Sequence, residues 1–122
     1  MSTLNVANVT DGTTSVATGY VVNGSAKAWA AHVLDAATSV DSLNVSSISD
    51  TGTGDNRINL SSNMDYANYS VVSQSSAIDN NSNPRNISLY DAPVGSYRIY
   101  ATTPSGSGSS QGSHTAAFGD LA

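Results

Sequence analysis

Two histidines, His32 and His114, are the only imidazoles in the chain, and they occur among many serines and several aspartates. Serine, histidine and aspartate are the residue types of a nucleophilic hydrolase site, where the imidazole takes the proton of the serine hydroxyl. The glycine spacing of a nucleophile elbow, G-x-S-x-G, occurs at 108–112 (GSSQG), but this match lies within a low-complexity Gly/Ser stretch that shows no strand-to-helix transition, which the elbow requires. The residue types are therefore present without the setting of the motif, and we expect that the protein is not an enzyme.

The residue patterns of metal and phosphate sites are likewise incomplete in this sequence. Imidazole nitrogen suits transition metals, and a histidine near the axis of a trimer would occur three times. Residues 50–56 are rich in oxygen ligands, yet they lack the acidic spacing and the final glutamate of an EF-hand. The glycines of 106–112 are not followed by a lysine, as a phosphate loop requires. We expect packing or surface histidines, a hairpin turn and a surface loop, with no metal and no cofactor.

The charge pattern excludes some partners. All nine acidic residues are aspartates, only four residues are cationic, and the net charge is −5. Nucleic-acid binding depends on many Lys and Arg contacts, so we expect none. There is no cysteine, which excludes disulfides and thiolate sites. Residues 1–5 lack the start of a secretory signal, and no stretch approaches the ~20 apolar residues of a membrane span. We expect synthesis in the cytoplasm and no membrane insertion.

The elements that would position any site are predicted to be strands. Segments rich in Val, Ile, Tyr and Thr alternate with Gly, Asn, Asp and Ser, which is typical of antiparallel sheets. The clearest unit is a hairpin of 43–48 with 57–60, joined by a turn with two glycines and carrying a bulge at Ser46 and Ser47. Further strands are predicted at 26–34, 69–73, 87–90, 96–102 and 114–118. The pattern predicts a small all-β antiparallel sandwich, jelly-roll-like.

Domain organisation follows from length and apolar content. A chain of 122 residues fits one ordinary domain, and a hydrophobic fraction of 39% gives a thin core. A thin core favours self-association, because small domains bury a smaller fraction of their surface. Residues 1–23 differ in composition, because their apolar residues are loosely spaced within a Thr- and Gly-rich segment, and they are interpreted as an extended N-terminal arm. Residues 24–122 form the predicted sandwich.

Two polar segments are predicted to be exposed loops, 79–85 and the Gly/Ser stretch 104–113. Trp29 favours packing in the core or between subunits over stacking on a sugar. The tyrosines suit either role, because each has an apolar ring and a hydroxyl; those considered are Tyr66, Tyr69, Tyr90, Tyr97 and Tyr100. Their placement on one surface is not determined by the sequence.

Four ordered blocks carry a resemblance to a known family: residues 23–29 (NGSAKAW), 43–55 (LNVSSISDTGTGD), 64–72 (MDYANYSVV) and 117–120 (AFGD). Over roughly residues 23 to 120 the chain resembles a module of tailed-bacteriophage tail-fibre or spike proteins. After Trp29 the family tends to continue with Asn, an aromatic residue and a Gly/Thr turn, whereas this chain has residues 30–37 (AAHVLDAA). The family's packing and sites around Trp29 are therefore the features that we least expect to find in this chain.

The resemblance implies a virion structural protein that adheres to the host surface as a homotrimer. Its arm, residues 1–23, would serve in virion attachment or in exchange between subunits, and attachment to other virion proteins would use Leu4, Val6 and Val9. Trp29 and Phe118 would pack in the core or between subunits. The host receptor, a surface glycan or protein, would be contacted by loop residues Asn80, Asn81, Asn83, Arg85, Ser109 and Gln111. The alternative is a head, neck or tail decoration protein that binds only other virion proteins.

Overall fold

The computed structural model describes residues 2–33, 38–76, 85–108 and 112–122. Within them the chain forms one helix and ten strands. In chain order they are β1 (Asn8–Thr10), β2 (Ser15–Ala17), α1 (Thr18–Gly24), β3 (Ala28–Val33), β4 (Thr38–Leu43), β5 (Val45–Gly52), β6 (Asp55–Leu60), β7 (Ser70–Ser76), β8 (Asn86–Asp91), β9 (Ser96–Thr102) and β10 (Gly112–Phe118). The strands predicted near 26–34, 69–73, 87–90, 96–102 and 114–118 are all confirmed.

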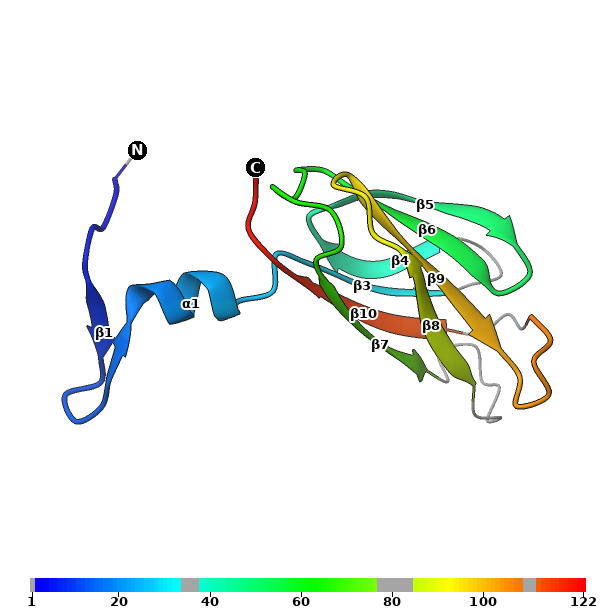
Figure 1. Ribbon diagram of the computed structural model, residues 1–122, viewed down its shortest axis with the longest axis horizontal. Helices are drawn as coiled ribbons and strands as arrows, with labels where there is room; N and C mark the ends of the chain where they lie inside the picture. Colours follow the sequence, from blue (N-terminus) through cyan, green and yellow to red (C-terminus); the bar gives the residue numbers. More distant parts are fainter. Residues whose placement is uncertain (1, 34–37, 77–84, 109–111) are drawn as a thin grey trace.

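Eight of the strands form two four-stranded antiparallel sheets that pack face to face (Figure 1). We call the sheet with the order β4-β3-β10-β7 the first sheet, and the sheet with the order β5-β6-β9-β8 the second sheet. The predicted all-β sandwich is confirmed. Its connections differ from a jelly roll, in which successive strands mostly alternate between sheets. Here three pairs of successive strands are each neighbours in the same sheet. They are β3–β4 in the first sheet, and β5–β6 and β8–β9 in the second.

The predicted hairpin is β5 with β6, and its turn has Gly54 at φ +73°, a conformation that glycine adopts without strain. The expected bulge is present, because the register shifts between Val45 and Ser47. The prediction was wrong in joining Leu43 to this strand. Asn44 has φ +56° and separates β4 from β5, so the chain passes there from the first sheet to the second. Its side chain holds the corner by accepting a 2.7 Å bond from the Ser62 amide.

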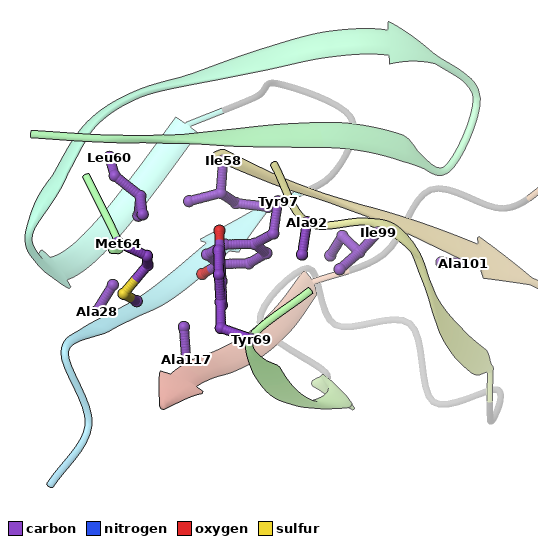
Figure 2. Close-up of a cluster of buried hydrophobic side chains, with 10 residues drawn as sticks. All are labelled: Ala28, Ile58, Leu60, Met64, Tyr69, Ala92, Tyr97, Ile99, Ala101 and Ala117. Atoms are coloured by element: carbon purple, nitrogen blue, oxygen red, sulfur yellow. The ribbon is translucent and has the colours of Figure 1, made fainter. Parts of the chain in front are cut away.

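The core lies between the sheets and is filled mainly from the second sheet (Figure 2). Alternate residues of β6 and β9 point inward, among them Ile58, Tyr97 and Ile99, each with no exposed surface. The ring of Tyr69 meets that of Tyr97 edge to face, with 6.5 Å between centroids. The complete buried apolar cluster is Ala28, Ile58, Leu60, Met64, Tyr69, Ala92, Tyr97, Ile99, Ala101 and Ala117.

The inner face of the first sheet carries smaller side chains. β3 turns Ala28, Ala30 and His32 inward, and β10 turns Ser113, Thr115 and Ala117 inward. The Thr115 hydroxyl and the Tyr97 hydroxyl share a hydrogen bond, with 2.7 Å between their oxygens. This sheet therefore contributes mainly alanines and short polar groups to the core. The larger apolar side chains come from the second sheet and from the connection between β6 and β7, which adds Met64 and Tyr69. Ser113 falls within the predicted Gly/Ser loop, so that loop ends earlier than expected.

The N-terminal arm is not extended throughout, in contrast to the prediction. β1 and β2 form a hairpin whose turn is held by the Asp11 carboxylate, which accepts bonds from the amides of Thr13 and Thr14 at 2.9 and 2.7 Å. Helix α1 follows, and its last turn is held by the Lys27 ammonium and the Ser25 hydroxyl, which both donate to the Val22 carbonyl. Figure 1 shows the arm standing away from the sandwich.

Candidate functional site

The arm presents apolar side chains to solvent. Within 2–24 every residue except Thr18 is exposed, and Leu4 and Tyr20 are 84% and 78% exposed. The predicted attachment residues Leu4, Val6 and Val9 are all among the exposed large apolar side chains, and the structure adds Val16, Tyr20, Val21 and Val22. Single exposed apolar residues are ordinary, but a concentration of them on one small element is typical of a surface that another molecule covers.

The predicted receptor-contact residues can be placed only in part. Asn80, Asn81, Asn83, Ser109 and Gln111 lie outside the described residues. Arg85 is described, and it is half-buried immediately before β8. The grouping of these residues on one surface therefore stays a prediction.

Trp29 and Phe118 lie on the outer face of the first sheet. Each follows a core alanine in its strand, Ala28 or Ala117, so the alternation of a strand turns it away from the core. Both are half-buried, and neither belongs to the core cluster. Of the two packing roles expected for them, packing in the core is wrong, and packing between subunits stays a prediction.

The register places Trp29 in an apolar row that crosses the whole first sheet. Trp29 pairs with Leu43 on β4 and with Ala116 on β10, and Ala116 pairs with Val72 on β7. The two ends of the row, Leu43 and Val72, are 49% and 55% exposed. A shallow hollow of about 230 Å³ lies beside the row, and His114 is among its lining residues. This row, with Phe118, forms an apolar stripe on the outer face of the first sheet, beside the exposed polar residues His114 and Gln74.

The two histidines lie on opposite faces of the first sheet and do not form one site. His32 is fully buried, and its Nε2 is 3.1 Å from the Ser113 hydroxyl. His114 is exposed, and its Nε2 is 3.0 Å from the Ser76 hydroxyl. Burial lowers the pKa of His32 to about 4, with a smaller effect from His114. The His32–Ser113 pair superficially resembles a nucleophile with its base, but both residues are enclosed, so a substrate does not reach the hydroxyl in this structure.

A network of crossed ion pairs lies on the outer face of the second sheet. Arg57 of β6 donates two bonds to the Asp91 carboxylate of β8, at 3.0 and 2.9 Å, and one to the Ser96 hydroxyl at 2.9 Å. Arg98 of β9 donates two bonds to the Asp55 carboxylate of β6, one of them at 2.7 Å from Nε. The two arginines are cross-strand neighbours, so the pairs reach in opposite directions across the sheet.

Two tyrosines accompany the network. The Arg98 guanidinium carbon lies 4.4 Å from the centroid of the Tyr90 ring, which is a cation–π contact. Tyr100 pairs with Asp55 on the neighbouring strand and is half-buried. Tyr90 sits at an irregularity of β8, where the register shifts between Leu89 and Asp91. Bulges re-aim side chains and are frequent beside functional sites.

This network was not predicted from the sequence. The alternation of β6 places Asp55, Arg57 and Asn59 on one face, and that signal is readable in the sequence. The partners were not readable, because Asp91 lies 34 residues from Arg57 and Asp55 lies 43 residues from Arg98. Only the pairing of β6 with β9 and of β9 with β8 brings these four side chains together.

Within the described part of the chain, no group of three or more His, Cys, Asp or Glu side chains is arranged to hold a metal ion. In the same part, no helix has the length and apolar character needed to cross a membrane. Comparison of the chain with protein-family models, with curated proteins and with solved structures found no match.

Proposed function

We propose that the chain is a virion structural protein of the tail-fibre or spike type, which self-associates as a homotrimer and adheres to the host surface. The observation that carries the proposal is the position of its large apolar side chains. They are exposed on the arm and across the outer face of the first sheet, as Leu4, Tyr20, Leu43 and Val72 illustrate. Two such surfaces on one small chain suit a subunit of a larger assembly.

The arm is assigned the attachment role. Its hairpin and helix form one unit, because Thr18, the first residue of α1, hydrogen-bonds to the chain before β1. The Thr18 amide donates to the Ala7 carbonyl at 2.9 Å, and the Thr18 hydroxyl donates to the Val6 carbonyl at 2.6 Å. This unit has no buried residue of its own, so burial of its apolar side chains requires another protein. Other virion proteins are the proposed partners of this surface.

The outer face of the first sheet is assigned to the contact between copies. Trp29, Leu43, Val72 and Phe118 present rings and branched side chains there, and aromatic residues are enriched in the cores of protein interfaces. In a trimer each copy would also present its second sheet and its loops to the host, and three weak contacts made together give useful attachment.

Self-association is tested by light scattering on the purified full chain. We expect a mass three times the chain mass of 12.4 kDa. The variant Val72→Asp should be monomeric, because it places a charge within the apolar row. Ser88→Asp is the matched control, since it adds the same charge on the outer face of the second sheet and should leave the trimer intact. A monomeric parent chain would contradict the trimer.

Adhesion is tested by binding of the labelled full chain to a panel of bacterial cells. We expect binding to particular hosts, and Leu4→Asp with Tyr20→Asp in the arm should preserve it, because the arm faces the particle and not the cell. Binding to purified phage particles with no binding to any cell in the panel would favour the decoration protein over the adhesin.

A further inference from the structure

We propose that the outer face of the second sheet is a binding site for an uncharged saccharide, which stacks on Tyr90 and hydrogen-bonds to the Asp91–Arg57 pair. This deepens the proposed adhesion function and rests on it for the source of the ligand. It differs from the receptor site predicted from the sequence, because none of Asn80, Asn81, Asn83, Arg85, Ser109 and Gln111 contributes.

Tyr90 supplies the stacking surface. The residue is 68% exposed even though the Arg98 guanidinium covers part of one ring face. The apolar C–H face of a sugar ring packs on an exposed aromatic ring, as other apolar groups do. The contact with Arg98 fixes the orientation of the ring, so little conformational freedom is lost when a ligand binds.

Asp91 and Arg57 supply the polar contacts beside that ring. Because of the bulge in β8, two consecutive residues, Tyr90 and Asp91, serve the same outer face. Each oxygen of the Asp91 carboxylate accepts one bond from Arg57, and a carboxylate oxygen has a second lone pair for a sugar hydroxyl. The side chains of Asp91 and Arg57 are 38% and 27% exposed, so a ligand can reach both.

The charges decide the chemical class of the ligand. The two arginines of the network are each paired with a carboxylate by two bonds, so the face carries no unpaired positive charge from Arg57 or Arg98. The chain as a whole has a net charge of −5, which repels polyanions. A neutral polyhydroxyl ligand uses the paired groups without breaking them, whereas an acidic saccharide would have to displace a carboxylate.

The experiment is an NMR titration of the ¹⁵N-labelled full chain with methyl pyranosides of glucose, galactose, mannose and N-acetylglucosamine. We expect at least one of them to shift the amides of Tyr90, Asp91 and Arg98. Tyr90→Ala should weaken that binding about tenfold, whereas Tyr90→Phe should retain it because the ring remains. Tyr66→Ala is the matched control, since Tyr66 is 72% exposed in the loop between β6 and β7.

The saccharide site is overturned if none of the four glycosides shifts these amides, if the shifts lie elsewhere, or if Tyr90→Ala and Tyr66→Ala behave alike. Tighter binding of a heparin fragment at the same amides would overturn the neutral class. The outcome is separable from adhesion itself. Cell binding that survives Tyr90→Ala would reject this site and leave the proposed adhesion standing. Glycoside binding at Tyr90 in a chain that binds no cell would support this site and reject the proposed adhesion.

Discussion

The two sheets of the sandwich distribute polarity in opposite ways. The second sheet turns Ile58, Tyr97 and Ile99 toward the core and its ion pairs toward solvent, as expected for a half-buried antiparallel sheet. The first sheet turns alanines, His32 and Ser113 toward the core and carries Trp29 on its outer face.

This contrast shows that the thin core is only part of the apolar content of the chain. The first sheet and the arm hold large apolar side chains that the isolated chain leaves outside, and their burial requires a partner. The outer face of the second sheet instead carries the paired charges of Arg57 and Arg98, and its exposed ring is that of Tyr90. The two outer faces are therefore suited to different tasks, assembly for the first sheet and ligand contact for the second.

The largest expected effect comes from truncating the core residue of the second sheet. Ile58→Ala should lower the free energy of unfolding by about 2–5 kcal/mol, because Ile58 is fully buried and its loss leaves a cavity. Leu43→Ala on the outer face of the first sheet should change it by less than about 0.5 kcal/mol in the monomer. Urea denaturation at a protein concentration that prevents association measures both. Equal losses would show that the sheets do not differ as described.

The next largest expected effect is a pH dependence of folding stability, caused by the buried histidine of the first sheet. Burial lowers the pKa of His32 from 6.5 to about 4, so the unfolded chain takes up the proton at a higher pH than the folded chain. Stability that is present above pH 6.5 is therefore lost as the pH falls toward 4, by about 3 kcal/mol in total. Thermal unfolding of the parent and of His32→Gln across this range checks the expectation. The variant should lack this pH-dependent loss, and an unchanged profile would contradict the assignment to His32.

The smallest effect comes from the ion pairs of the second sheet. The hydrogen bond from Arg98 holds the pKa of the Asp55 carboxyl below its ordinary value, despite the opposing effect of burial. The stabilisation from the Asp55–Arg98 pair is present above the ordinary aspartate pKa, and it is lost as the pH falls through the lowered pKa of Asp55 in the folded chain. Asp55→Asn should lower the Tm by a few degrees at neutral pH and match the parent in strong acid. A difference that persists in strong acid would indicate a packing defect in the variant, not the loss of the pair.

Much of the strand arrangement could be predicted because its causes are local. The glycines of the turn at 52–54 and the alternation of Arg57, Ile58 and Asn59 define the β5–β6 hairpin within one short segment. The corner at Asn44 was missed, because its φ of +56° is supported by bonds to Ser62, 18 residues away in the chain. The helix α1 was missed because Tyr20, Val21 and Val22 are poor helix formers, and contacts from Ser25 and Lys27 hold its last turn.

The candidate site shows the same limit. Tyr90 was one of five tyrosines that suited either packing or contact, and the sequence offered no means of separating it from Tyr69 and Tyr97. The structure separates them, since Tyr69 and Tyr97 are in the core and Tyr90 faces outward beside Arg98. The receptor residues predicted in the loops lie largely outside the described chain, so they stay a prediction.

The sequence by itself determined where seven of the eight sandwich strands run, because alternation and turn residues act over a few positions. The strand β4 and the corner that follows it were not among them. Alternation also chose the inward side of β6, whose polar and apolar residues alternate over 57–60, but in strands with apolar residues on both sides only the tertiary structure made this choice. In β3, Ala28 and Trp29 are both apolar, so alternation alone does not choose between them, and the choice is made by the space that Ile58, Tyr97 and Ile99 already fill. The pairing of Arg57 with Asp91 was decided in the same way, because register across three strands brings together residues that are remote in the chain.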